Sequence, residues 1–164
     1  MFPLKRSRHC TTWSVWVFAC VLLVSCTTTD VFEKNIAIPD HAWSKQFKPE
    51  ITFTIKDTTS RYNIYIVLRH TDAYHFRNIW LNIHTQSPTG VSKSQPLDLQ
   101  LADDQKGWLG SGMDDIYEHR IMITSPQRPE SLSAGTYHFT LEHIMREDPL
   151  ANVMNVGIRL EKVK

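Results

Sequence analysis

The stretch that decides the fold reads Tyr62-Asn63-Ile64-Tyr65-Ile66-Val67-Leu68-Arg69. Its apolar side chains recur at every second position from Tyr62 to Leu68, which is the period of a β-strand and not of a helix. Tyr65 and Val67 make the opposite face apolar as well, so both faces of the strand are expected to be covered. We therefore predict that this strand is central in a sheet.

Seven other short segments alternate in the same way, and residues typical of turns separate them. Pro39-Asp40 and Ser87-Pro88-Thr89-Gly90 are two of these turn clusters. Pro96 would begin the fifth strand, a position that suits proline. The segments that we expect to flank the central strand are 31–38, 51–55, 79–83, 97–101, 116–124, 135–145 and 156–160.

Eight short strands joined by turns are typical of an antiparallel sandwich or barrel. We predict an all-β fold, an antiparallel β-sandwich that is jelly-roll-like and has about eight strands. An eight-stranded barrel of lipocalin type is the alternative, since the number of strands does not separate the two architectures.

The N-terminal segment resembles a bacterial lipoprotein signal peptide. A short basic region that includes Lys5 and Arg6 is followed by an apolar run from Trp13 to Val24, which is shorter than the roughly 20 residues of a membrane-spanning helix. The run ends in Leu23-Val24-Ser25-Cys26, which resembles the lipobox, where the cysteine after a small residue is lipidated. We predict a signal peptide at 1–25, a lipidated Cys26 with a tether at 26–30, and a single β-sandwich domain at 31–164.

Processing at this site changes the cysteine count and the charge of the chain. Cys10 and Cys20 leave with the signal peptide and the lipid consumes Cys26, so no disulfide, thiol nucleophile or cysteine metal site remains. The full chain has 18 Lys and Arg against 17 Asp and Glu, and three of the basic residues lie in the signal peptide. Without a basic block, nucleic acid is not an expected partner.

The tether Thr27-Thr28-Thr29-Asp30 has no acidic run behind the cysteine. In some bacterial lipoproteins such a run is associated with export to the cell surface. Its absence favours an outer-membrane anchor that faces the periplasm, with the lipid on Cys26 as the contact to the membrane.

No catalytic motif emerges from the chain. Gly110-Ser111-Gly112 is not a nucleophile elbow, because the glycines must stand two residues from the serine, where this chain has Leu109 and Met113. Ser111 is therefore interpreted as a turn residue. Four acidic residues near this bend fail the spacing of a calcium-binding EF-hand and are interpreted as solvated loop acids: Asp103, Asp104, Asp114 and Asp115.

Three histidines lie close enough in sequence to raise the hypothesis of a zinc site: His70, His75 and His84. No compact pair of histidines and no carboxylate partner reinforces the pattern. We interpret them as exposed histidines of loops and strand faces, and we predict neither a metal nor another cofactor.

Aromatic residues are the remaining candidates for a site. Exposed aromatic rings on a β-sandwich can stack on sugar rings or anchor a protein partner. Trp80 shares its strand face with Asn82 and His84, so its ring is expected to be exposed. Trp43 is a further aromatic candidate, but most aromatic residues of buried strands belong to the core, and only Trp80 is expected to be exposed. The candidate contacts for a partner or a glycan are Trp80, Trp108 and Tyr74.

Several motifs in a fixed order resemble one known family. They are the central strand at 62–69 followed by Asn78-Ile79-Trp80-Leu81, the bend Gly107-Trp108-Leu109-Gly110-Ser111-Gly112, the segment Gly135-Thr136-Tyr137-His138-Phe139, and the C-terminal Val156-Gly157-Ile158-Arg159-Leu160-Glu161-Lys162. With the lipobox, the resemblance covers nearly the whole chain. It is to the GldH-type gliding motility lipoproteins of the Bacteroidetes.

The resemblance implies a non-enzymatic envelope lipoprotein, a structural or interaction component associated with the gliding machinery and linked to type IX secretion. Its partners would be other envelope proteins, and the family has no catalytic residues to carry over. The alternative function is that of a glycan-binding envelope lipoprotein that uses exposed aromatic residues.

Overall fold

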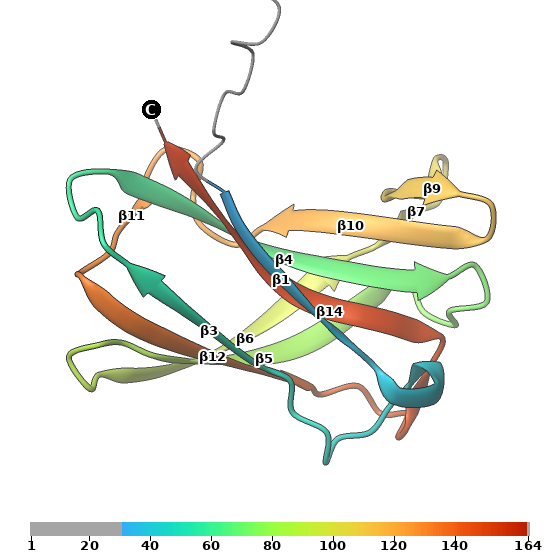
Figure 1. Ribbon diagram of the computed structural model, residues 1–164. Coiled ribbons are helices and arrows are strands. Elements are labelled where there is room, and N and C mark those ends of the chain that lie inside the picture. Colours follow the sequence, from blue (N-terminus) through green and yellow to red (C-terminus); the bar gives the residue numbers. More distant parts are fainter. Residues whose placement is uncertain (1–30, 164) are drawn as a thin grey trace, which may run out of the picture.

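The computed structural model describes residues 31–163 and builds them into two antiparallel sheets packed face to face (Figure 1). The predicted signal peptide, the lipidated Cys26 and the tether lie outside the described residues. In the part of the chain that is described, no helix is long and apolar enough to cross a membrane.

The first sheet has six strands, and its order was not evident from the sequence. Across the sheet the strands are β1 (Val31–Ala37), β14 (Val153–Val163), β4 (Arg61–Thr71), β10 (Ile116–Met122) and β9 (Ser111–Met113), with β11 (Glu130–Ser131) paired to the start of β4. The strand β4 therefore lies between β14 and β10, which confirms the predicted central strand.

The second sheet has four strands and covers the inner face of the first. In order they are β3 (Glu50–Ile55), β12 (Gly135–His143), β5 (Asn78–Gln86) and β6 (Ser92–Gln100). Two short ribbons and one 3-10 turn complete the described chain: β2 (Ala42–Trp43) with β13 (Leu150–Ala151), β7 (Ala102–Asp103) with β8 (Gly107–Trp108), and η1 (Pro39–His41).

The eight predicted strands correspond to β1, β3, β4, β5, β6, β10, β12 and β14. Counted along the chain, the first sheet holds the first, eighth, third and sixth of them, and the second sheet holds the second, seventh, fourth and fifth. This is the strand order of a jelly roll, so the predicted fold is confirmed. The division into two separate sheets excludes the closed sheet of a lipocalin-type barrel for residues 31–163.

The core lies between the sheets and is built from the inward rows that the alternation predicted. Ile66 and Leu68 of β4 are completely buried, as is Leu141 of β12. Phe53 of β3 stacks on Tyr137 and contacts Phe32 of β1, with ring centroids 5.4 and 5.5 Å apart, and so joins the two sheets. Burial of each such side chain contributes about 1.5–3 kcal/mol.

Two details differ from the sequence prediction. The strand β6 begins at Ser92, so Pro96 lies in its middle, opposite Asn82, and not at its start. The sheet tolerates proline there because β6 is an edge strand. The glycine-rich segment at 107–112 is also more than a bend, since it forms β8 and begins β9, and Ser111 is a strand residue.

Candidate interaction surfaces

Trp80 lies on the outward face of β5 and is 42% exposed, as its strand pattern predicted. Asn82 and His84 follow on the same face. Ser94 donates a hydrogen bond to Oδ1 of Asn82 (2.9 Å), and Nε2 of His84 lies 3.2 Å from Nδ2 of Asn82 and 3.4 Å from a carboxylate oxygen of Glu142. These polar groups therefore hold one another in place beside the indole ring.

Ile144 extends the surface around Trp80. It is exposed, and its backbone N–H donates to the carbonyl of Trp80 at 2.9 Å. The backbone N–H of Trp80 points to the sulfur of the buried Met145, 3.2 Å away. We name Trp80 and Ile144 the Trp80 patch, because this anchored segment holds both side chains at the surface.

Tyr74 and Trp108, the other two aromatic candidates, pack together on His70. The ring centroid of His70 lies 4.4 Å from that of Trp108 and 5.1 Å from that of Tyr74. Tyr74 is only 4% exposed and donates its hydroxyl to the carbonyl of Asn78 at 3.1 Å, while Trp108 is half-buried. The burial of Tyr74 leaves no ring face for a partner, which argues against its role as a contact for a partner or a glycan.

His70 makes a contact that the sequence did not reveal. Its Nε2 lies 2.9 Å from Nε2 of His119, and both side chains are buried. Nδ1 of His70 lies 2.6 Å from the carbonyl of Thr71 and donates to it, so Nε2 of a neutral His70 accepts from His119. Gly110 packs against the pair, because a Cβ there would lie 2.8 Å from Nε2 of His119.

Burial keeps the histidine pair neutral. Desolvation lowers the pKa of His70, and desolvation together with the neighbouring His70 lowers the pKa of His119 to about 4. The interpretation of His70 as an exposed histidine was therefore wrong. No local signal could have found its partner, because His119 lies 49 positions along the chain and meets it only through the pairing of β4 with β10.

The three histidines of the zinc hypothesis lie in three different surroundings. His70 pairs with His119, His75 is exposed near Glu147 (3.5 Å), and His84 lies by Asn82 and Glu142. Within residues 31–163, no group of three or more His, Cys, Asp or Glu side chains is arranged to hold a metal ion.

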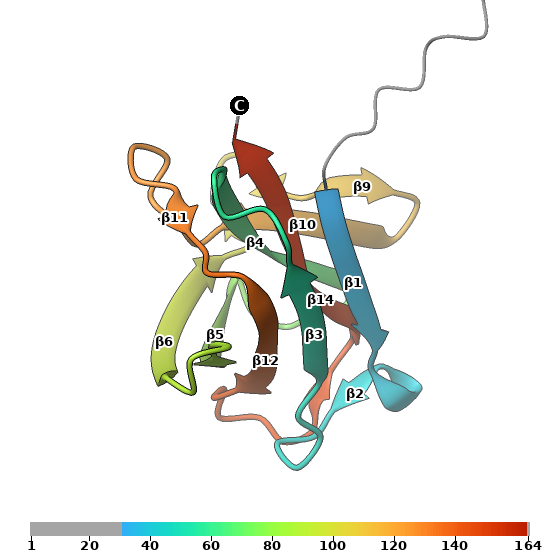
Figure 2. The same cartoon turned by 60° about the vertical axis from the view of Figure 1, so that its left-hand side comes forward.

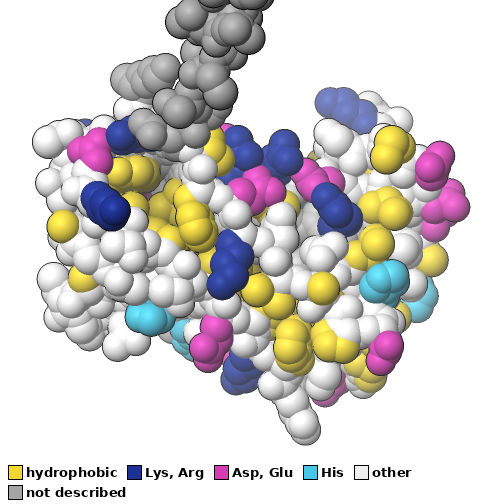
Figure 3. All heavy atoms as spheres, viewed as in Figure 1, with side chains coloured by type: hydrophobic (Ala, Val, Ile, Leu, Met, Phe, Trp, Pro, Cys, Tyr) yellow, Lys and Arg dark blue, Asp and Glu magenta, His cyan; other side chains and the backbone are white. Residues whose placement is uncertain are grey.

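The hairpin of β9 and β10 carries an apolar surface that sequence analysis missed. Met113 and Ile116 are cross-strand neighbours on either side of the turn Asp114-Asp115, and Met113 is 80% exposed. We name Met113 and Ile116 the hairpin patch; Figure 3 shows hydrophobic side chains beside acidic ones at the end of the molecule where Figure 1 draws β9. Apolar residues flanking an acidic pair at a turn were the available signal.

The outward face of the first sheet carries paired charges instead. Arg159 lies 2.8 Å from Glu33, Arg120 lies 2.8 Å from Glu118, and Arg69 also pairs with Glu118. Burial by itself raises the pKa of Glu33, but the hydrogen bonds from Arg159 and Asn35 and the charges of Arg120 and Arg159 together lower it. Val67 is buried beneath this layer although it points outward, which explains the two apolar faces of β4. These charged side chains therefore pair with one another on the same face of the sheet.

Comparison with known proteins identifies the family to which the chain belongs. The profile of the GldH lipoprotein family matches residues 30–160 of this chain. The chain is 26% identical over 155 residues to the gliding motility lipoprotein GldH of Flavobacterium johnsoniae, covering 90% of this chain and 94% of that protein. It is 24% identical over 155 residues to a GldH homolog of Christiangramia forsetii, covering 90% and 93%.

Solved structures offer more distant likenesses. A carbohydrate-binding module specific for non-crystalline cellulose aligns with 80% of this chain and 72% of its own, with a TM-score of 0.40 and 9% identity. The VP2 subviral particle of infectious bursal disease virus aligns with 82% of this chain and 31% of its own, with a TM-score of 0.31 and 11% identity. Likenesses at this level carry no functional argument.

Proposed function

Because the chain belongs to the GldH lipoprotein family, we propose that it is a non-enzymatic, lipid-anchored component of the gliding motility machinery linked to type IX secretion. It acts by binding other envelope proteins. The anchor is the lipid on Cys26, and the protein faces the periplasm from the outer membrane.

The hairpin patch is the observation that supports a role in protein binding. Met113 is the most exposed large apolar side chain of the described residues, and it stands on an edge strand whose outer side pairs with no other described strand. Apolar side chains at an open edge are a recurrent site of protein association. The flanking Asp114 and Asp115 favour a partner with basic residues around its apolar site.

Deletion of the gene tests the proposed function, and charged substitutions test the hairpin patch. We expect the deletion strain to lose surface spreading or type IX secretion while it grows normally. Re-expression of the protein restores the activity, whereas the double variant Met113→Lys/Ile116→Lys does not, because two charges now occupy the apolar contact.

Thr89→Lys is the matched control, since it adds a charge to an exposed turn away from the hairpin. It is expected to restore the deletion strain, and immunoblots of membranes check that all variants accumulate equally. A deletion strain that spreads and secretes normally would contradict the motility assignment. Full activity of the double variant would contradict the role of the hairpin patch in partner binding.

The lipid anchor has its own test. A soluble-export signal placed ahead of Thr27 bypasses Cys26 without touching the described fold, which begins at Val31. Stable anchoring requires more than one acyl chain or a second signal. We expect this protein in the soluble periplasmic fraction, and recovery with membranes after a high-salt wash would contradict the anchor.

Glycan binding is the second candidate function, and the Trp80 patch supports it. An exposed indole beside the amide of Asn82 and the hydroxyl of Ser94 combines a stacking face with hydrogen-bonding groups. We expect isothermal titration to detect saturable binding of an oligosaccharide that Trp80→Ala abolishes and that Leu109→Ala, at an exposed apolar position outside the patch, leaves intact. Binding unaffected by Trp80→Ala would exclude the patch.

A further inference from the structure

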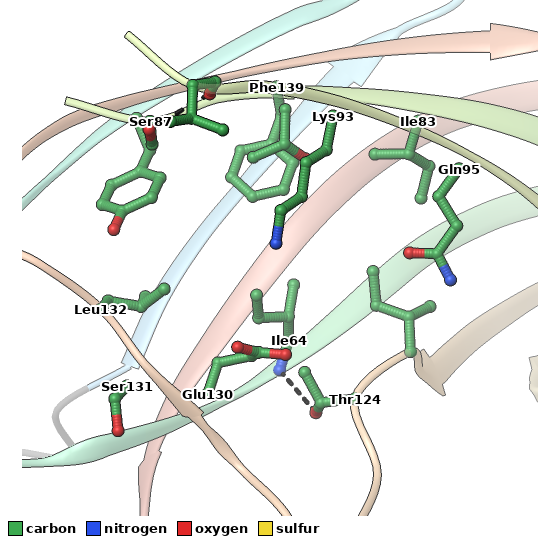
Figure 4. Close-up of a pocket in the computed structure, with 14 residues that line it drawn as sticks. Ile64, Ile83, Ser87, Lys93, Gln95, Thr124, Glu130, Ser131, Leu132 and Phe139 are labelled. Carbon is green, nitrogen blue, oxygen red and sulfur yellow. Dashed lines mark hydrogen bonds between the residues drawn. The ribbon is translucent and has the colours of Figure 1, made fainter. Parts of the chain in front are cut away.

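The sandwich is hollow at one edge. A cavity of about 310 Å³ opens between β6 of the second sheet and the β10–β11 segment of the first (Figure 4). Apolar side chains from both sheets form its walls, among them Ile64, Ile83, Leu132 and Phe139. Ligand pockets begin at about this size, and a cavity of about half the volume binds benzene.

The backbone explains why the sheets separate here. The ladder between β10 and β4 ends at Met122 opposite Tyr65. Beyond it, the Ile123 N–H still donates to the Ile64 carbonyl at 2.9 Å, and the hydroxyl of Thr124 accepts from the Ile64 N–H at 3.2 Å. The chain then leaves β4 and pairs with it again at β11. The first sheet therefore lacks a regular strand over this part of the core.

On the opposite side of the cavity, the inward side chains of β6 change from apolar to polar. Along β6 the inward positions run from Leu99 and Leu97 to Gln95 and Lys93, as their pairing with the inward residues of β5 requires. Lys93 and Glu130 both point into the cavity, from opposite sheets (Figure 4). Two charged side chains and the neutral Gln95 at core-facing positions indicate a polar mouth above an apolar interior, which suits an amphipathic ligand.

The cavity lies at the end of the sandwich from which the tether departs. Val31 pairs with Glu161, and Glu161 pairs with Asn63, the neighbour of the cavity residue Ile64. Two strand spacings are about 10 Å, and the five residues 26–30 reach about 17 Å when extended. The start of β1, the end of β14 and β11 lie at this one end in both views (Figures 1 and 2).

We propose that this cavity binds a fatty acyl chain, with the apolar walls around the chain and Lys93 at its oxygen-bearing end. The inference rests on the proposed lipidation of Cys26, which brings this end of the domain to a membrane. The reach of the tether makes the lipid of Cys26 the expected source, and a bilayer lipid is the other source of the same chemistry.

The protein carrying the soluble-export signal tests the site, because it contains all described residues and no lipid. Titration with cis-parinaric acid, which fluoresces in apolar sites, is expected to saturate at one molecule per protein. Thr85→Phe fills the cavity from the inward face of β5 and weakens binding at least 10-fold, whereas Gln86→Phe, one position along on the outward face, leaves it unchanged.

Lys93→Met tests whether Lys93 contacts the oxygen-bearing end of the ligand. We expect it to weaken binding of the free acid about 10-fold and to leave binding of the methyl ester unchanged, since only the acid carries a charge. Thermal melting checks that each variant is folded. Absence of saturable binding by the folded protein, or equal binding by Thr85→Phe, overturns the proposal, while the motility tests of the hairpin patch remain unaffected.

A second experiment distinguishes the lipid of Cys26 from a bilayer lipid as the source of the acyl chain. The lipidated protein is placed in nanodiscs that contain a photo-crosslinking phosphatidylcholine, and labelled peptides are mapped by mass spectrometry. If the lipid of Cys26 fills the cavity, the peptides of Ile83 and Leu132 stay unlabelled. Labelling that Thr85→Phe abolishes would retain the acyl-chain site and overturn Cys26 as its source.

Discussion

The inward row of β4 passes through two buried environments that differ in chemistry. At its centre, Ile66 and Leu68 are completely buried among apolar side chains, whereas His70, two positions further, is equally buried but pairs with His119. The first environment is insensitive to pH and depends on close packing. The second depends on the hydrogen bond between the two neutral histidines. Two equally buried environments therefore differ in their sensitivity to pH.

Ile66→Ala should have the largest effect, a loss of about 2–5 kcal/mol in the free energy of unfolding, because it removes buried surface and leaves a cavity. Urea denaturation followed by tryptophan fluorescence measures the change. Val91→Ala, at an exposed position, is the control and should stay within about 0.5 kcal/mol of the unchanged protein. A comparable small loss for Ile66→Ala would contradict its place in the core.

Lowering the pH should reduce the free energy of unfolding through the buried histidine pair, whereas the apolar centre of β4 has no group that titrates. Burial lowers the pKa of folded His119 to about 4, and the unfolded side chain titrates near 6.5. The unfolded state therefore binds more protons between these values, so stability is complete above about pH 6.5 and falls as the pH drops toward 4. The full loss is on the order of 3 kcal/mol.

Denaturation between pH 7 and 5 measures this slope while most carboxylates remain charged. The buried His143, whose pKa burial also lowers, contributes in the same direction. The double variant His70→Phe/His119→Phe should therefore retain only the shallower slope of the remaining histidines. An unchanged slope in the double variant would mean that the pair does not couple folding to pH.

Breaking the pair from one side should cost less than emptying the core. His119→Phe leaves Nε2 of His70 buried without its donor, at a cost of about 1–3 kcal/mol. Replacing both histidines by Phe removes the unsatisfied atom and should recover part of that loss, as a double-mutant cycle at pH 7 would measure. Strictly additive losses would contradict a shared hydrogen bond.

The smallest effect belongs to the charged outer face of the same strand. Arg159→Met removes the contacts to Glu33 and Glu161 and should cost at most about 1 kcal/mol, because surface ion pairs are weak. The loss should shrink further in 1 M salt, which screens such pairs. A loss as large as that of Ile66→Ala would show that the outer layer, and not the core, supports β4.

Much of the fold could be predicted because alternation is a local property of each strand. The inward rows of β4, β5 and β12 follow from every second residue, and so does the exposure of Trp80. The start of β6 was missed because 92–96 is polar throughout: its inward positions face a cavity and not a packed core, so the apolar period disappears. Tyr74 remained among the candidate contacts because no local rule indicates that a loop aromatic packs on a histidine.

By itself, the sequence determined an all-β antiparallel fold, which strand is central and which residues face inward, since these follow from a two-residue period and its turns. The choice between sandwich and barrel was left to the tertiary structure. Only the tertiary structure decided the jelly-roll order, the pairing of His70 with His119, the hairpin patch and the cavity at the edge. Each of these depends on which distant strands become neighbours, and that is set by packing two complete sheets against each other.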